Sequence, residues 1–250
     1  MNLKKSASDF TLYYHLNRKS LWIEAWALGT FMISAALCTI ALDRWLPLQF
    51  ISYQRLFTGM AMGLTAIGII YSPWGKFNGV QMNPAFTLTM LWLDKIEKHT
   101  AILFVVFQFI GGAIALTLVN LWLHPDLSKA HVNYVMTIPQ NQHWLSAFIA
   151  EVIISFLLFI MVLYSSNESV TKNYTGIFAG ILIMLFITFE SPLSGMSMNP
   201  ARSFASALVA NNFQYLWIYF TAPFIGMMSA GQIWKSWLCK RNHYRCSYIG

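Results

Sequence analysis

The chain has 250 residues, of which 57% are hydrophobic and 10% are charged, and its mean hydropathy is +0.53. Soluble domains carry about 25% charged residues, so this composition excludes an ordinary soluble protein and predicts an integral membrane protein. The net charge of +7 would also suit nucleic-acid binding. However, Lys and Arg lie at the ends of apolar segments and form no basic stripe, so we expect no nucleic-acid partner.

Six apolar segments are long enough, some only just, to cross a hydrocarbon core about 30 Å thick. Basic residues precede the first of them, as in a signal peptide, but its apolar stretch exceeds the roughly 7–15 residues of such a leader. We therefore expect it to stay as a membrane anchor. The six segments are Leu21–Leu42, Leu56–Tyr71, Ala101–Leu123, Trp144–Tyr164, Tyr174–Phe189 and Gln214–Leu238.

Two further apolar segments, Asn83–Leu93 and Asn199–Ala210, are too short to cross a membrane alone. At about 1.5 Å per helical residue, each covers about half of the hydrocarbon core, so two placed end to end make one crossing. The sequence predicts an all-α membrane protein with six transmembrane helices and two re-entrant half-helices.

The chain contains an internal repeat. "NGVQMNPA" (Asn78–Ala85) matches "SGMSMNPA" (Ser194–Ala201) 116 residues later. Matches at nearly the same spacing continue on both sides, and they include two Gly-x-x-x-Gly pairs that we expect to serve helix packing. Three spans per repeat is an odd number, so the second copy must enter the membrane upside down. The further matches are Gly59 and Gly63 with Gly176 and Gly180, Gln108–Gly112 with Pro223–Met227, and Ala27–Phe31 with Val152–Phe156.

Lys and Arg are more frequent in the two tails and in the loops on the same side than in the opposite loops. The positive-inside rule therefore places both termini in the cytoplasm, and we expect a multi-pass protein of the plasma or bacterial inner membrane. We expect a single transmembrane channel domain over residues 1–250. It divides into a cytoplasmic N-terminal segment (1–20), a first repeat (21–123), a second repeat (144–238) and a cytoplasmic tail (239–250).

Each short segment begins with Asn-Pro, at Asn83-Pro84 and Asn199-Pro200. Asn is a preferred N-cap, and Pro suits the first helical position. In inverted repeats the two N-termini meet near the bilayer centre, where each contributes about half a positive charge and each Asn offers N–H donors. Non-helical backbone at this depth must line a wet cavity, so the preceding loops are expected to expose carbonyls along a pore. These are the carbonyls of Gly79, Val80, Gln81, Gly195 and Ser197.

These features resemble the major intrinsic protein (aquaporin) family over about residues 20–238. The resemblance rests on the motifs Asn83-Pro84-Ala85 and Asn199-Pro200-Ala201, on Arg202 directly after the second motif, and on the inverted repeat. It implies a homotetramer in the lipid bilayer with one pore per subunit. We expect no cofactor and no metal.

The resemblance also implies a selectivity filter. Arg202 matches the family's constriction arginine, Met196 the loop contributor three residues before the second Asn, and Ile187 the fifth-helix contributor. The second-helix contributor falls at Met62, with Gly63 as the competing choice. Arg202 donates hydrogen bonds to passing water and repels cations in this interpretation; the alternative is that it only ties the loop to backbone carbonyls.

Several positions depart from the family's usual residues. Met62 and Ile187 stand where water-selective members usually have Phe and His, and Gln81 replaces a His. Ser203 stands where glycerol-type members usually have Asp, which argues against polyols. We therefore expect a passive channel for water and for small neutral solutes such as ammonia, carbon dioxide or hydrogen peroxide, which excludes protons and ions. The alternatives are a glycerol or small-polyol facilitator and a non-conducting structural membrane protein.

Two acidic residues fall within predicted spans. Glu151 matches the family's buried glutamate of the fourth helix, which we expect to accept backbone N–H groups from a pore loop. Its first-repeat counterpart is expected near Trp26, two residues from Glu24, so that half is expected to be altered. The alternative for both acids is a proton relay, since intramembrane acids are functional candidates by default.

Two other patterns are weak. Gly195-Met196-Ser197-Met198 begins like the G-x-S-x-G elbow of serine hydrolases but lacks its second Gly, so we expect no enzyme. Cys239, His243 and Cys246 are possible metal ligands on the tail, although reduced bystander residues are the favoured interpretation in a cytoplasmic compartment.

Overall fold

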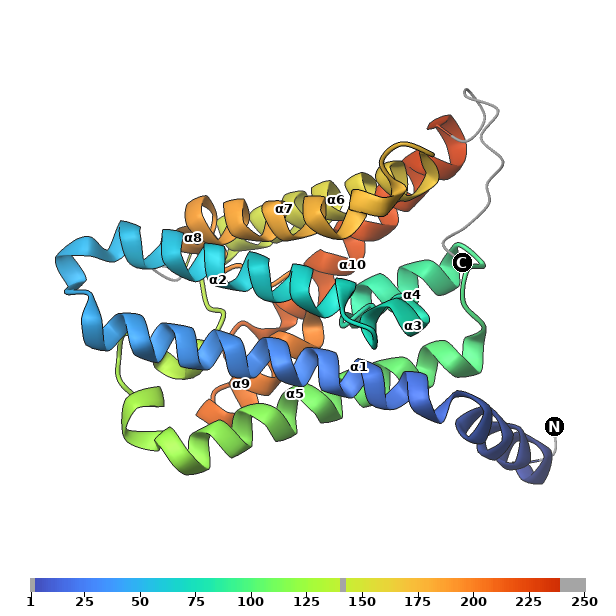
Figure 1. Ribbon diagram of the computed structural model, residues 1–250, viewed down its shortest axis with the longest axis horizontal. Helices are drawn as coiled ribbons and strands as arrows, with labels where there is room; N and C mark the ends of the chain where they lie inside the picture. Colours follow the sequence, from blue (N-terminus) through green and yellow to red (C-terminus); the bar gives the residue numbers. More distant parts are fainter. Residues whose placement is uncertain (1–2, 140–142, 239–250) are drawn as a thin grey trace.

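The computed structural model describes residues 3–139 and 143–238. Six long helices run along the longest axis of the molecule (Figure 1). Of these, α1, α5, α6 and α7 lie in segments that are long and apolar enough to cross a membrane by length and composition. The six are α1 (Leu3–Trp45), α2 (Ile51–Tyr71), α5 (Lys98–Leu127), α6 (Trp144–Asn167), α7 (Thr175–Phe189) and α10 (Leu216–Ile233).

The two half-helices are α4 (Pro84–Trp92) and α9 (Pro200–Ala210). They start near the middle of the molecule and run in opposite directions, α4 toward the end where α1 begins and α10 ends, and α9 away from it (Figure 1). Single helical turns precede the two pore loops and occur in other loops. These are α3 (Gly75–Asn78), α8 (Ser191–Ser194), the 3-10 turns η1 (Leu48–Phe50), η2 (Asn133–Val135) and η4 (Lys172–Tyr174), and the π-helical turn η5 (Trp234–Leu238).

The helices pair as an inverted repeat requires. In the first half α1 packs on α5, in the second half α6 packs on α10, and α2 packs on α7 to join the halves. The α2–α7 contact depends on small residues, because a Cβ atom at Gly63 would lie 2.5 Å from the carbonyl oxygen of Gly180. At Gly59 it would lie 2.6 Å from the carbonyl oxygen of Met184. The expected packing role of these glycines is confirmed.

Each half-helix packs against the opposite repeat. α9 contacts α5 of the first repeat, and α4 contacts α10 of the second. An aromatic pair marks the α5–α9 contact, where the rings of Phe109 and Phe204 lie 5.3 Å apart. A second pair joins α4 to α6 of the second repeat, where the rings of Phe86 and Phe159 lie 5.0 Å apart. This exchange interlocks the halves and brings the N-termini of α4 and α9 together at the centre.

Helix boundaries differ from the sequence prediction chiefly at α1. This helix begins at Leu3 rather than Leu21 and has 43 residues, which at about 1.5 Å per residue exceeds the thickness of a bilayer. Its N-terminal turns project beyond the bundle (Figure 1). The polar segment Asn17–Ser20 has no helix-breaking residue, so the helix continues through it.

Candidate functional site: a pore between two helix N-termini

Asn83 and Asn199 cap the two half-helices in nearly the same conformation. Their φ and ψ angles are −147° and 115°, and −145° and 108°. The Oδ1 atom of Asn83 accepts from the backbone N–H of Ala85 and Phe86, and that of Asn199 accepts from Ala201 and Arg202. Pro84 and Pro200 occupy the first helical turns. The predicted capping is confirmed.

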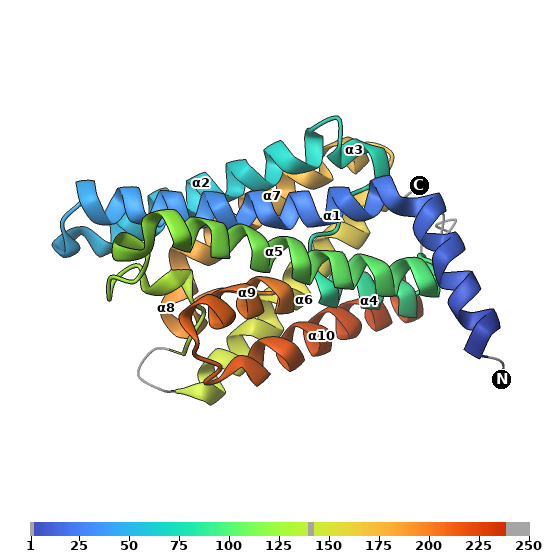
Figure 2. The same cartoon turned by 90° about the horizontal axis from the view of Figure 1, so that it is seen from below.

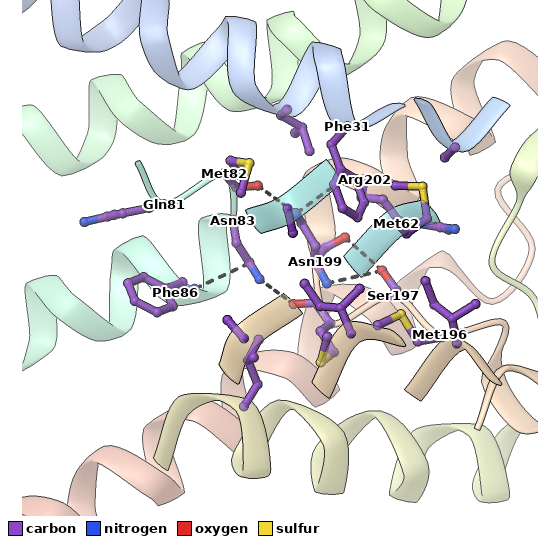
Figure 3. A pocket seen from close by; sticks show the side chains of 18 of the residues that line it. Phe31, Met62, Gln81, Met82, Asn83, Phe86, Met196, Ser197, Asn199 and Arg202 are labelled. Carbon is purple, nitrogen blue, oxygen red and sulfur yellow. Dashed lines mark hydrogen bonds between the residues drawn. The ribbon is translucent and has the colours of Figure 1, made fainter. Parts of the chain in front are cut away.

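The two caps are also joined across the centre (Figure 3). Asn83 Nδ2 donates to the carbonyl of Met198 at 2.7 Å, and Asn199 Nδ2 donates to the carbonyl of Met82 at 2.6 Å. An amide NH₂ group carries two N–H bonds, so each Asn retains one donor beyond this cross-link. The reciprocal pair fixes both amides at the meeting point of the half-helices.

Buried glutamates hold both pore loops. Glu151 on α6 accepts from the backbone N–H of Ser197 and Met198, as expected. Glu24 on α1 accepts from the N–H of Gln81 and Met82 at 2.9 and 2.8 Å. The expectation that the first half is altered is therefore wrong: Glu24 itself is the counterpart of Glu151.

Each of these two carboxylates also accepts a hydrogen bond from a side chain. Gln108 on α5 donates to Glu24 at 2.8 Å and to Thr87 of α4 at 3.0 Å. The hydroxyl of Ser194 donates to Glu151 at 2.7 Å. Both glutamates are fully buried, and each accepts hydrogen bonds from backbone N–H groups of a pore loop. These contacts favour a role in holding the loops over a role as a proton relay.

A continuous cavity of about 1330 Å³ passes the central asparagines. It is lined near the terminal end by Asn17 and Lys172, and near the opposite end by Gln54 and His131. Both pore loops line it, and among the described residues no protein group donates to the carbonyls of the loop residues expected to face the pore. Those residues are Gly79, Val80, Gln81, Gly195 and Ser197.

The expected filter residues Met62, Ile187, Met196 and Arg202 all line this cavity. Gly63 does not, because it faces α7. The geometry therefore favours Met62 over Gly63 as the second-helix contributor. In Figure 3 Met62 and Arg202 lie close together on the α9 side of the central asparagines.

The sequence reasoning missed Phe31 of α1, which lines the cavity beside Arg202 (Figure 3). A signal was present, because Phe31 lies seven residues after Glu24 and residues two helical turns apart share a face. Leu28, four residues after Glu24, lines the cavity as well.

The guanidinium of Arg202 does not bind loop carbonyls. Among the described residues, no carbonyl accepts a hydrogen bond from it, and its Nη1 atom is buried without a partner. Among these described groups the carboxylate of Glu151 attracts the guanidinium electrostatically, but no hydrogen bond or ion pair joins the two. This arrangement leaves guanidinium donors for a molecule inside the cavity.

Hydroxyl groups tie α9 to the loop between α5 and α6. Thr137 Oγ1 lies 2.6 Å from Ser203 Oγ, which lies 2.5 Å from Ser197 Oγ, and Ser197 donates to the carbonyl of Asn199 at 2.9 Å. No described histidine hydrogen-bonds Ser197, as a hydrolase nucleophile would need. The hydroxyl groups of Ser203 and Ser197 therefore hold the second pore loop in place against α9 and the loop that contains Thr137.

The possible metal ligands Cys239, His243 and Cys246 lie outside the described residues. Within residues 3–139 and 143–238, no three His, Cys, Asp or Glu side chains gather as a metal site would require.

Comparison with known proteins agrees with this geometry. The family model described as "Major intrinsic protein" matches residues 15–234. The chain is 30% identical over 209 residues to putative aquaporin NIP4-1 of Arabidopsis thaliana, covering 83% of this chain and 71% of that protein. It is 32% identical over 174 residues to aquaporin NIP3-1 of the same plant, covering 68% of this chain but only 53% of the relative.

The fold is similar to the X-ray structure of the aquaglyceroporin from Plasmodium falciparum. The TM-score is 0.72, the identity is 17%, and the match covers 89% of this chain and 97% of that one. Identity this low supports the fold alone, but the family model covers most of the chain. The chain therefore belongs to the major intrinsic protein family, the aquaporins and their relatives, and is a multi-pass membrane channel protein.

Proposed function

We propose that the chain is a passive channel that conducts water and small neutral solutes and excludes protons and ions. One observation carries the proposal: Asn83 and Asn199 are cross-linked at the centre of a continuous cavity, and each retains one N–H donor. A water molecule at this point accepts two hydrogen bonds from the protein. Its own protons then point outward to the neighbouring water molecules.

Carbonyls on either side of the centre continue the path. The loops from Gly79 and Gly195 offer acceptors that replace part of the hydration of a passing molecule. A cation finds two positive helix N-termini at the centre, and the charged Arg202 at one end. Since no carboxylate of the described residues lines the cavity, the desolvation of the cation, which costs several kcal/mol, is not offset.

The order of solutes follows from the constriction. Met62, Ile187, Met196 and Phe31 offer it few hydrogen-bonding groups. Replacing the hydration of a polyol there is costly, so ammonia, carbon dioxide and hydrogen peroxide rank ahead of glycerol. The residue type at position 203 supports the same ranking, because Ser203 stands where a glycerol channel is expected to have Asp.

The assembly and orientation belong to the same proposal. We place the protein in the plasma or bacterial inner membrane as a homotetramer, with a pore in each subunit and with both termini in the cytoplasm. The excess of Lys and Arg at the end of the molecule that holds both described chain ends supports this orientation.

Osmotic shrinkage of proteoliposomes tests the proposal. Vesicles with the protein should shrink faster than empty vesicles after an osmotic step, without any ion gradient, and glycerol should enter much more slowly than water. A rate equal to that of empty vesicles would favour a non-conducting structural protein. Rapid glycerol entry would instead favour a polyol facilitator.

A further inference from the structure

A second cavity lies outside the pore, on the outer surface of the bundle. Its volume is about 430 Å³, and it is lined by Trp92 at the end of α4 and by four residues of α10. α4 and α10 lie side by side in both ribbon views (Figures 1 and 2). The α10 residues are Met228, Ser229, Gln232 and Ile233.

The groove is mainly apolar and open. Trp92, Met228 and Ile233 expose 38%, 38% and 43% of their surface. α10 can approach α4 here because Gly231 has no side chain: a Cβ atom there would lie 3.3 Å from the Trp92 ring. The helix widens into a π-helical turn directly after the groove, at Trp234.

Two lysines lie beside the groove without being among its lining residues: Lys95 follows α4 and Lys235 follows α10. The Nζ atom of Lys235 lies 5.9 Å from the centre of the Trp92 ring. Lys95, three residues after Trp92, is close enough to Lys235 for their charges to repel. Asp94 also acts on Lys95 and offsets part of the positive charge of the two lysines.

An apolar groove with a pair of lysines beside it is complementary to an anionic phospholipid. We propose that this groove binds an anionic phospholipid of the cytoplasmic leaflet, with an acyl chain along Trp92, Met228 and Ile233 and the phosphate between Lys95 and Lys235. Lys95 also lines the mouth of the pore cavity, so the headgroup lies at the rim of the pore. The choice of leaflet rests on the proposed orientation, but lipid binding itself does not depend on conduction and is tested in detergent, so the two can fail separately.

Lipid binding to the delipidated protein in detergent tests the headgroup. Native mass spectrometry should show tighter binding of dioleoyl-phosphatidylglycerol than of dioleoyl-phosphatidylcholine. Each surface lysine contributes about fivefold to the binding of an anionic lipid, so Lys95→Gln and Lys235→Gln should each weaken phosphatidylglycerol binding by about that factor. Lys172→Gln removes a lysine from another part of the pore mouth and should leave binding unchanged. Equal binding of the two lipids, or equal losses in all three variants, would overturn the proposal.

A second pair of variants tests the acyl chain. Ser229→Phe fills the groove and leaves both lysines in place, whereas Thr221→Phe adds the same bulk to an exposed site on α10 outside the groove. Only Ser229→Phe should weaken phosphatidylglycerol binding. If Ser229→Phe instead changes the oligomeric state and leaves lipid binding intact, the groove is a contact between copies of this chain and the proposal is wrong.

Discussion

The two pore loops share the left-handed backbone at Gly79 and Gly195 and at Met82 and Met198, but Met196 has a φ of 51° whereas its counterpart Val80 has no positive φ. Their side chains differ as well. Positive φ angles of 56° at Met82 and 54° at Met198 turn successive N–H groups toward a buried glutamate in each half. The same turn then presents an Asn cap. Left-handed backbone is costly for residues other than Gly, and it recurs at matching positions because each cap needs the same approach to the centre.

The matching side chains differ on both sides of the caps. Phe86 and Arg202 occupy matching positions, and the N–H of each is bound by its Asn cap. Gln81 and Ser197 also match, but the Gln81 Oε1 atom has no protein partner, whereas Ser197 is hydrogen-bonded within its own loop. The features common to both halves, the Asn caps, lie at the centre of the cavity. The residues that differ between the halves make the two sides of the centre chemically different.

The largest expected effect tests the symmetric part. Glu24→Ala and Glu151→Ala each leave two buried backbone N–H groups without an acceptor, at about 1–3 kcal/mol per group. Both should lower thermal stability in detergent strongly and to a similar extent, whereas the exposed control Asp94→Asn should not, because Asn tolerates the positive φ of 59° at that position. If Glu24→Ala lowered the thermal stability much less than Glu151→Ala, the two glutamates would not support their pore loops equally.

A smaller effect should occur at the expected selectivity filter. Two neighbouring residues distinguish an effect on solute selectivity, at Met62, from an effect on helix packing, at Gly63. Met62→Ala widens the constriction, so the ratio of glycerol to water permeability should rise several-fold. Gly63→Ala places a methyl group against the Gly180 carbonyl and should cost about 1–3 kcal/mol of stability with the ratio unchanged. Stopped-flow measurements on both variants check this, and a ratio that responds to Gly63→Ala alone would reverse the assignment.

The smallest effect concerns the mouth near the termini. Desolvation, assisted by Lys235, lowers the pKa of Lys95 to about 8, against the opposing effect of Asp94. Lys95 is therefore mostly charged at pH 7 and mostly neutral at pH 9. Phosphatidylglycerol binding should weaken over this range by up to about fivefold. Lys95→Arg keeps its charge and should remove the pH dependence; an unchanged pH dependence in this variant would exclude Lys95 as its source.

Much of this arrangement was predictable from the sequence, because the Asn-Pro caps and the repeat fix where the half-helices begin. Glu24 was misplaced because α2 has 21 residues and α7 only 15. The spacing between α1 and its pore loop therefore differs from that in the second half, and an error of two residues turns a helical side chain to the opposite face. The groove at Trp92 depends on how α4 and α10 approach, which local sequence does not encode.

The most direct test compares the two matching positions after the caps. Arg202→Val and Phe86→Val are measured in proteoliposomes for osmotic water flux and for proton entry under an imposed potential. Both variants should conduct water at or above the wild-type rate, and Arg202→Val alone should admit protons or small cations, because it removes the charge at the filter. If Arg202→Val folds, conducts water and shows no added leak at any potential, Arg202 does not exclude ions and the proposed division of roles between the two halves is wrong.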